Sequence, residues 1–273
     1  MGLMQQSSLL VRPETVASGR IIHVTPQSAG LRYVGFDVWR LPKGESASAE
    51  TGAREACLVF LSGRASVEAG GKPLGLVGER SSPFNGKPWS VYVPAGSSWQ
   101  VKAETDLEFA VCSAPASGKG SPRVIAPDEL TIEERGTGTN LRHVVNILPE
   151  TDPTAESLLV VEVITPSGHW SSYPPHKHDR DALPEESLLE ETYYHRIKPP
   201  QGFAIQRIYT DDRALDETIA VGDRDTTLVP RGYHPCAAPH GYDLYYLNTM
   251  AGPHRTWRVH NEPAHEWILN PPA

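Results

Sequence analysis

Hydrophobic positions along this chain fall into short runs rather than into long helical stripes. The runs alternate apolar with polar residues, or are rich in β-branched and aromatic side chains, and both patterns are typical of β-strands. In the first half of the chain they predict strands at residues 20–24, 32–41, 57–61, 65–68, 90–93, 99–103 and 107–112.

After a break the same pattern predicts strands at residues 158–165, 191–197, 203–209, 218–221, 226–229, 243–248 and 256–259. Between the two sets, residues 126–135 have a proline and carboxylates near their start and are followed by a glycine, as helix ends prefer. We therefore predict one short connecting helix there. The small, polar residues 114–122 mark the end of the first strand set.

These elements predict an all-β chain with two tandem domains, residues 1–140 and 141–273. The length of 273 residues fits two domains of about 150 residues each. Glycine (23 residues) and proline (25 residues) interrupt the chain too often for a helical bundle. The two halves also share a turn, Pro94-Ala95-Gly96 and Pro230-Arg231-Gly232, each following a short apolar run, which is a weak internal repeat.

Charge and cysteine content exclude several classes of function. The formal net charge is -8 and we find no clusters of Lys and Arg, so nucleic-acid binding is excluded. No run approaches the ~18 apolar residues of a membrane span. Cys57, Cys112 and Cys236 are an odd number of widely spaced thiols, which fits a reducing compartment. We expect a cytoplasmic protein without disulfides.

Histidine is concentrated in the second half, where nine of the eleven lie at or after residue 169. Because side chains alternate along an extended segment, His176 and His178 share a face and Lys177 points away from them. Glu191 opens the next predicted strand, and His234 follows the second Pro-x-Gly turn. Three imidazoles and a carboxylate predict one divalent transition metal, Zn, Mn, Fe, Ni or Co, rather than Ca or Mg, which prefer oxygen ligands.

The spacing of these residues resembles the two signature motifs of the cupin superfamily, whose domains are double-stranded β-helix or jelly-roll barrels. The first half resembles a second, degenerate cupin in which Trp99 stands where a metal histidine is usually found. The resemblance implies a bicupin with a structural, metal-free N-terminal barrel and a catalytic C-terminal barrel.

One departure from the cupin pattern leaves the carboxylate ligand open. Twelve residues separate His178 from Glu191, where only a few are usual, so other carboxylates compete with Glu191. We prefer Glu191 because a strand-like Thr-Tyr-Tyr follows it and because Leu-Pro-Glu-Glu before it is typical of a loop. The rivals are Asp179, Glu185, Glu186 and Glu190.

A longer, ordered set of motifs is similar to the 5-deoxy-glucuronate isomerase family of inositol catabolism. The motifs are WSSYPPHKHD at 170–179, ETYY at 191–194, PPQGF at 199–203, QRIYTDD at 206–212, VPRGYHP at 229–235 and GYDLYYLN at 241–248. This resemblance implies an aldose-ketose isomerase that converts 5-deoxy-D-glucuronate to 5-dehydro-2-deoxy-D-gluconate through an enediolate, with a divalent metal in the second barrel.

Such a reaction needs a group that moves a proton between neighbouring carbons. Tyr193 and His195 share the inward face of the strand that Glu191 opens, and His195 is our first choice as base; an ordinary structural histidine is the alternative. Arg207, between apolar residues on a predicted strand, is our candidate clamp for the substrate carboxylate. If it is not the clamp, Arg231, Arg142 and Lys177 remain. Tyr173 and Tyr246 are candidates for contacts to the sugar hydroxyls.

Two other functions remain open at this point. A bicupin with this ligand set could be an Fe(II) dioxygenase, which oxygen consumption would reveal. It could also be a sugar-acid-binding module without catalysis. The expected partner is a small sugar acid, and exposed sheet edges favour a homo-oligomer.

Overall fold

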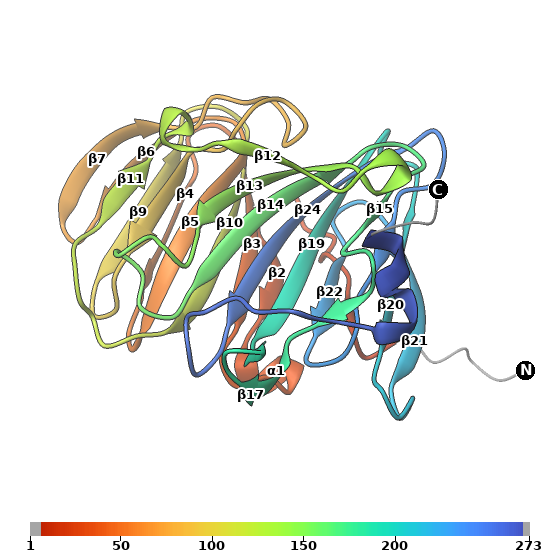
Figure 1. Ribbon diagram of the computed structural model, residues 1–273. Coiled ribbons are helices and arrows are strands. Elements are labelled where there is room, and N and C mark those ends of the chain that lie inside the picture. The colour runs from red at the N-terminus through yellow and green to blue at the C-terminus, as the bar shows by residue number, and fades with distance from the viewer. Residues whose placement is uncertain (1–6, 270–273) are drawn as a thin grey trace, which may run out of the picture.

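The computed structural model describes residues 7–269, and these fold into two β-barrels that lie side by side (Figure 1). The N-terminal barrel has a six-stranded sheet in the order β11 (Arg123–Ile125), β8 (Ser90–Val93), β5 (Arg54–Ser62), β10 (Leu107–Pro115), β3 (Gly35–Leu41) and β2 (Gly19–Val24). Its second sheet has the order β4 (Ser46–Glu50), β9 (Ser98–Ala103), β6 (Ala65–Ala69) and β7 (Lys72–Val77).

The C-terminal barrel has a seven-stranded sheet in the order β1 (Leu10–Val11), β22 (Thr226–Val229), β19 (Glu190–Lys198), β24 (Asp243–Ala251), β14 (Leu159–Thr165), β13 (Arg142–Leu148) and β12 (Ile132–Arg135). The opposing sheet has the order β15 (Trp170–Ser171), β23 (Cys236–Ala237), β20 (Ala204–Tyr209) and β21 (Asp216–Val221). Two short pairs join β16 (His176–Lys177) to β25 (His260–Asn261) and β17 (Asp179–Ala182) to β18 (Glu186–Leu188). The predicted all-β arrangement of two tandem barrels is confirmed.

Helical structure in the described residues is limited to short turns: α1 (Pro26–Ala29), η1 (Pro127–Glu129), η2 (Gly138–Asn140) and η3 (Pro263–Leu269). None of the helices within residues 7–269 has the length and apolar content that a membrane span requires.

The predicted connecting helix at residues 126–135 is wrong. The proline and carboxylates start only the single turn η1, after which Leu130 is extended and β12 pairs with β13. Cross-strand pairing with β13 therefore overrides the local helix signal. The strand predicted at residues 256–259 is also wrong, because the backbone N–H groups of Trp257 and Arg258 donate to the side chains of Glu150 and Ser187 instead of to the backbone of a neighbouring strand.

The two barrels share a strand register that relates their interiors position by position. In each barrel the strand before the Pro-x-Gly turn, β8 or β22, pairs with the equivalent strand, β5 or β19. Ala56 lies opposite Val93, and Glu191 lies opposite Val229, so Ala56 occupies the position of Glu191. Counted from the same turns, the position of His234 is taken by Ser98, one residue before Trp99.

The next inward positions of β5 and β19 extend this correspondence. Leu58 matches Tyr193, and Phe60 matches His195. Across the sheet, Phe60 pairs with Phe109 where His195 pairs with Tyr246. The N-terminal barrel thus has apolar side chains where the C-terminal barrel has polar ones.

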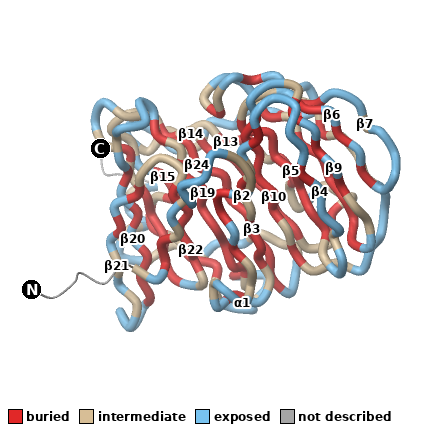
Figure 2. The backbone as a smooth tube through the Cα atoms, turned by 180° about the vertical axis from the view of Figure 1, so that it is seen from behind, coloured by how far each residue is buried: buried red, intermediate tan, exposed pale blue. Residues whose placement is uncertain are grey.

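Aromatic side chains fill the N-terminal barrel. The Phe109 ring lies 5.9 Å from the rings of Phe60 and Trp99, measured between centroids, and Trp39 stacks on Phe109 at 6.4 Å. Phe60, Phe109 and Trp99 are at most 4% exposed. The buried residues run along the central strands of both barrels (Figure 2).

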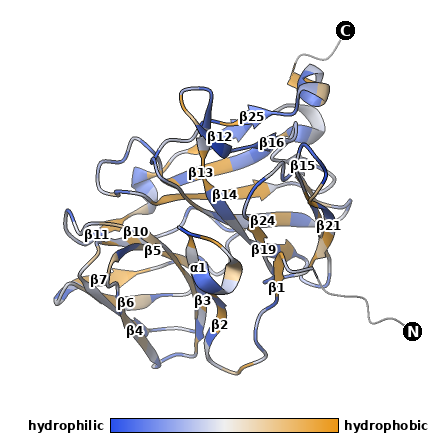
Figure 3. Ribbon diagram, turned by 90° about the horizontal axis from the view of Figure 1, so that it is seen from below, coloured by the Kyte–Doolittle hydropathy of each residue, from blue (hydrophilic) through white to orange (hydrophobic). Residues whose placement is uncertain are grey.

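Reciprocal carboxylate contacts join the two barrels. Glu55 is the residue before Ala56 on β5. Its carboxylate accepts hydrogen bonds from the backbone N–H groups of residues 156–158, just before β14. Glu190, at the matching position of β19, accepts those of residues 32–34 at the start of β3. Arg80 and Glu162 add a buried bidentate ion pair with both N···O distances at 2.9 Å. Figure 3 shows β3, β5 and β10 beside β14, β19 and β24 where these contacts form.

Candidate metal centre

Three of the four predicted ligands converge inside the C-terminal barrel. His178 follows β16, Glu191 lies on β19, and His234 follows the turn after β22; one ligand atom of each lies within 4.8 Å of the others. All three side chains are at most 2% exposed. The long-range pairing of the sheet, rather than proximity in sequence, therefore brings the donors together.

Backbone carbonyls orient both imidazoles toward the carboxylate. His178 Nδ1 lies 2.9 Å from the carbonyl oxygen of Leu189, and His234 Nδ1 lies 2.8 Å from that of Gly232. When each Nδ1–H donates to its carbonyl, each Nε2 presents a lone pair. These Nε2 atoms lie 3.2 and 3.3 Å from Glu191 Oε2.

Two lone pairs facing a carboxylate in a buried site are costly unless a cation or a proton lies between them. His234 Nε2 is buried without a hydrogen-bond partner among the described residues. Carbonyl contacts at the second ring nitrogen are also the usual support of metal-bound histidines. The donor set therefore fits a borderline divalent cation.

His176 adjoins this group. Its ring centroid lies 5.0 Å from that of His234 and 6.4 Å from that of His178, and the side chain is half-buried. Burial lowers the pKa of His176 to about 3. Burial also lowers the pKa of His234 to about 3. Both are neutral near pH 7, the form that binds metals.

The rival carboxylates have other partners or lie outside. Glu190 binds backbone groups of the other barrel, and Glu186 accepts hydrogen bonds from the backbone of Asp179 and from Arg180. Asp179 accepts from the backbone N–H of Gly232 and pairs with Lys177. Glu185 is exposed. Lys177 itself points away from the imidazoles, as the alternation predicted, and binds Asp211.

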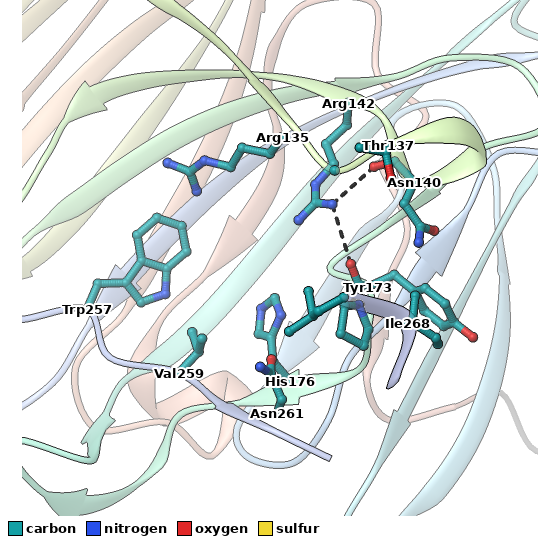
Figure 4. Close-up of a pocket in the computed structure, with 13 residues that line it drawn as sticks. Arg135, Thr137, Asn140, Arg142, Tyr173, His176, Trp257, Val259, Asn261 and Ile268 are labelled. Carbon is teal, nitrogen blue, oxygen red and sulfur yellow. Dashed lines mark hydrogen bonds between the residues drawn. The ribbon is translucent and has the colours of Figure 1, made fainter. Parts of the chain in front are cut away.

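A cavity of about 510 Å³ opens beside His176 (Figure 4). A narrow inner cavity of about 40 Å³, lined by His176, Glu191, Tyr193 and Tyr246, reaches the ligand group. Of the three converging donors, Glu191 lines this inner cavity.

The predicted catalytic residues lie at different depths. Tyr193 lines the inner cavity, and its hydroxyl lies 3.0 Å from Ser172 Oγ. Burial, reinforced by the charge of Glu191, raises the pKa of Tyr193, so the phenol stays protonated. Tyr246 lines the same cavity and its hydroxyl contacts Ser171.

His195 lies further along β19 and lines neither of these two cavities. Its Nε2 lies 3.2 Å from Gln206 Oε1 and 3.1 Å from Thr227 Oγ1, and its ring stacks on Tyr193 with centroids 6.0 Å apart. Burial lowers its pKa to about 3. The structure does not bring His195 into contact with the space that a substrate would fill.

The structure also does not bring Arg207 to this site. Alternation along β20 turns Gln206 into the barrel and Arg207 to the outside, where its guanidinium is 43% exposed and forms a bidentate ion pair with Asp216. Tyr173 contributes its backbone carbonyl to the main cavity, while its ring packs on the exposed Trp170 with centroids 5.1 Å apart.

Sequence reasoning missed several residues that line the cavities, above all Arg135 and Trp257, and gave Arg142 only as an alternative clamp. Arg135 and Arg142 lie on the β12–β13 hairpin, which the sequence analysis assigned to a connecting helix and a domain boundary. Trp257 lies in a segment that was predicted to be a strand. The available signal was that two arginines, Arg135 and Arg142, lie seven residues apart with Gly136 between them.

Comparison with known proteins gives a full-length match. Residues 9–268 match the model of the KduI/IolB family. The chain is 54% identical over 252 residues to the 5-deoxy-glucuronate isomerase of Geobacillus kaustophilus, covering 92% of this chain and 91% of the relative. It is 48% identical over 268 residues to that of Bacillus subtilis, covering 96% and 99%. The family resemblance predicted from the sequence is confirmed.

Solved structures agree with the fold. An IolB-like protein from Salmonella typhimurium superimposes with a TM-score of 0.93 at 53% identity, covering 96% of this chain and all of the other. The oxalate decarboxylase of Lactobacillus farciminis superimposes with a TM-score of 0.65 at 11% identity, covering 94% and 89%. The second likeness concerns the fold alone, and the predicted bicupin architecture is confirmed.

Proposed function

The chain belongs to the KduI/IolB family, and from this premise we propose how it carries out the isomerase activity of its relatives. The activity is the isomerisation of 5-deoxy-glucuronate, the aldose-ketose interconversion expected from the sequence. We assign the reaction to the C-terminal barrel, where His176, His178, Glu191 and His234 would hold one divalent transition metal. The observation that carries this assignment is the convergence of the two Nε2 lone pairs on Glu191.

A bound metal would supply a Lewis acid that stabilises negative charge developing on substrate oxygens. The remaining roles belong to side chains that line the cavity. Tyr193 and Tyr246, whose hydroxyl groups are held by Ser172 and Ser171, line the narrow inner cavity. Because its pKa is raised, Tyr193 keeps its proton at neutral pH and can donate a hydrogen bond to a substrate oxygen.

His195 is better suited to a positioning role than to that of the base. It packs behind Tyr193 and is held by Gln206 and Thr227, so it fixes the ring that faces the cavity. A change at His195 should therefore alter the orientation of Tyr193 without removing a group that touches the substrate.

The test is an incubation of the purified protein with 5-deoxy-glucuronate in D₂O, followed by NMR. We expect loss of the C1 proton signal with metal-loaded protein, and no loss after metal removal by a chelator until a divalent metal is restored. Full activity of the metal-free protein would contradict the assignment. Substrate-dependent oxygen consumption would instead support a dioxygenase.

A further inference from the structure

We propose that Arg142 recognises the substrate carboxylate and thereby selects sugar acids over neutral sugars. This inference rests on the proposed isomerase function. Arg142 begins β13 and lines both the main cavity and the inner cavity, as His176 does. Figure 4 shows its guanidinium and the His176 ring facing the same space from different elements.

The hairpin that carries Arg142 places two like charges together. Arg135 on β12 lies directly opposite Arg142 on β13. Like charges at facing positions destabilise a strand pair, so the arrangement needs an anion to offset it. Arg135 already has one, because its Nε and Nη2 donate to Glu133 at 3.1 and 2.7 Å, and its guanidinium also lies 5.6 Å from the Trp257 ring.

Arg142 lacks such a partner. Its Nη1 donates to the carbonyl oxygens of Asn140, at 3.1 Å, and Tyr173, at 3.4 Å. Within residues 7–269 it forms no ion pair, and its Nε and Nη2 make no hydrogen bond. A guanidinium fixed at one nitrogen, with the others free, presents the fork of donors that matches a carboxylate.

The local sequence is built to hold Arg142 in this position. Gly136 has a φ of +82°, and a Cβ there would lie 2.3 Å from the Asn140 carbonyl oxygen and 2.8 Å from Arg142 Nη1. Glycine is therefore required for the turn that lets Asn140 hold the guanidinium. The glycine that suggested a helix end in the sequence instead shapes the cradle of this arginine.

Arg142 and the ligand group lie at positions that one substrate can span. Arg142, His176 and Glu191 all line the inner cavity. The side chain of Trp257 lines the same cavity. A sugar acid held through its carboxylate at Arg142 would extend its other end toward Glu191.

The experiment compares an acid with its alcohol. We would measure kcat/KM for 5-deoxy-glucuronate and for 5-deoxy-glucose, and the dissociation constants of D-glucuronate and D-glucose by calorimetry. Arg142→Gln should lower kcat/KM for the acid, and weaken glucuronate binding, by about ten- to a hundredfold, the range for charge-assisted hydrogen bonds. The acid-to-alcohol ratio of kcat/KM and the ratio of the two dissociation constants should change by the same factor, and the metal content should stay unchanged.

Matched variants make the result specific. Arg258→Gln is the control. Arg258 is an exposed arginine next to Trp257 and lines neither cavity, so its replacement should change neither ratio. An unchanged acid-to-alcohol ratio in Arg142→Gln would overturn the proposal. Loss of the preference for the acid in Arg207→Gln would also overturn it, because it would place the carboxylate outside the barrel.

Failure of the isomerase assignment is a separate outcome. If wild-type protein with bound metal isomerises neither compound, that assignment fails, while the two dissociation constants still decide the role of Arg142.

Discussion

The two barrels share one strand arrangement but differ in what fills them. Facing inward on β5 are Ala56, Leu58 and Phe60, whereas the same positions of β19 hold Glu191, Tyr193 and His195. Apolar side chains close the first barrel by packing against Phe109 and Trp99. Polar side chains leave the second barrel with a cavity and a buried donor group.

This contrast shows how one framework separates stability from chemistry. A polar interior is costly because every buried donor and acceptor must find a partner. The C-terminal barrel meets part of this need through Ser171, Ser172, Gln206 and Thr227, and we assign the rest to a metal and a substrate. The corresponding inward positions of β5 carry only apolar side chains, and the N-terminal barrel supports its neighbour through the contacts of Glu55 and Arg80.

The largest effect is expected from Glu191→Ala. It removes the carboxylate on which both histidines converge, so metal content should fall from about one per chain toward zero. The rate constant kcat/KM should fall about a thousandfold or more, because Lewis-acid stabilisation contributes several kcal/mol. Elemental analysis and the NMR assay measure both. Full retention of metal, with loss in Glu186→Ala instead, would show that the carboxylate assignment is wrong.

The mirror change, Ala56→Glu, tests the other half of the comparison. It buries a carboxylate among apolar side chains without the histidines that surround Glu191. We expect the free energy of unfolding in urea to fall by about 3–5 kcal/mol. Ala56→Met, similar in size and uncharged, is the control and should cost less. Equal stability of the glutamate variant and wild type would contradict the view that this interior tolerates no unpaired charge.

The reciprocal contacts of Glu55 and Glu190 predict that each carboxylate contributes about equally to the free energy of unfolding. Glu55→Gln and Glu190→Gln each replace a carboxylate oxygen by a donor that faces backbone N–H groups. Each should lower the free energy of unfolding by about 1–3 kcal/mol. Glu190→Gln should also keep its metal, although Glu190 is next to Glu191. A strongly unequal pair of values would break the symmetry that the shared register implies.

Lys177 tests whether a side chain outside the cavity supports the metal ligands of the C-terminal barrel. Its Nζ binds Asp211 and Asp179, and lies 5.5 Å from the ring of Tyr233, the neighbour of His234. Lys177→Met should weaken metal affinity by about ten- to a hundredfold, as loss of supporting contacts does at metal sites. A competition titration with a chromogenic chelator measures it. Lys177→Arg should recover part of the affinity; equal affinity in the methionine variant and wild type would remove Lys177 from the account.

The smallest effect concerns pH and the contact of Glu156 with residues 117–119. Burial raises the pKa of Glu156, but hydrogen bonds from Ser117 and three backbone N–H groups outweigh burial and lower the pKa to about 2. Because the folded pKa is depressed, the contact stabilises the protein above pH ~4.5 and is lost as pH falls toward 2. The Tm difference between wild type and Glu156→Gln should therefore shrink over this range. A constant difference would contradict this origin.

The sequence predicted those parts of the fold that depend on local pattern. The strands at 90–93 and 226–229 were predicted at their observed ends because short β-branched runs precede Pro-x-Gly turns. The pattern could not reveal β4, whose small and charged residues lack a clear alternation, or β12, whose strand form depends on pairing with β13.

The residues of the candidate site also fall into those that the local pattern predicted and those that it could not. His178, Glu191 and His234 could be named because residue type and parity determine which side chains point inward. Arg207 was chosen because apolar neighbours suggested burial, yet parity on β20 turns it outward and gives the inward position to Gln206. Arg142 was only one of several alternatives, because its role depends on a hairpin that no local signal distinguished from a helix.

The most direct test of the account is a crystal structure of the active, metal-loaded protein with anomalous diffraction recorded at the absorption edge of its metal. The account predicts one anomalous peak per chain, bounded by His176, His178, Glu191 and His234, and no peak among the rings of Phe60, Trp99 and Phe109. A peak inside the N-terminal barrel, or an active crystal with no peak near Glu191, would contradict it.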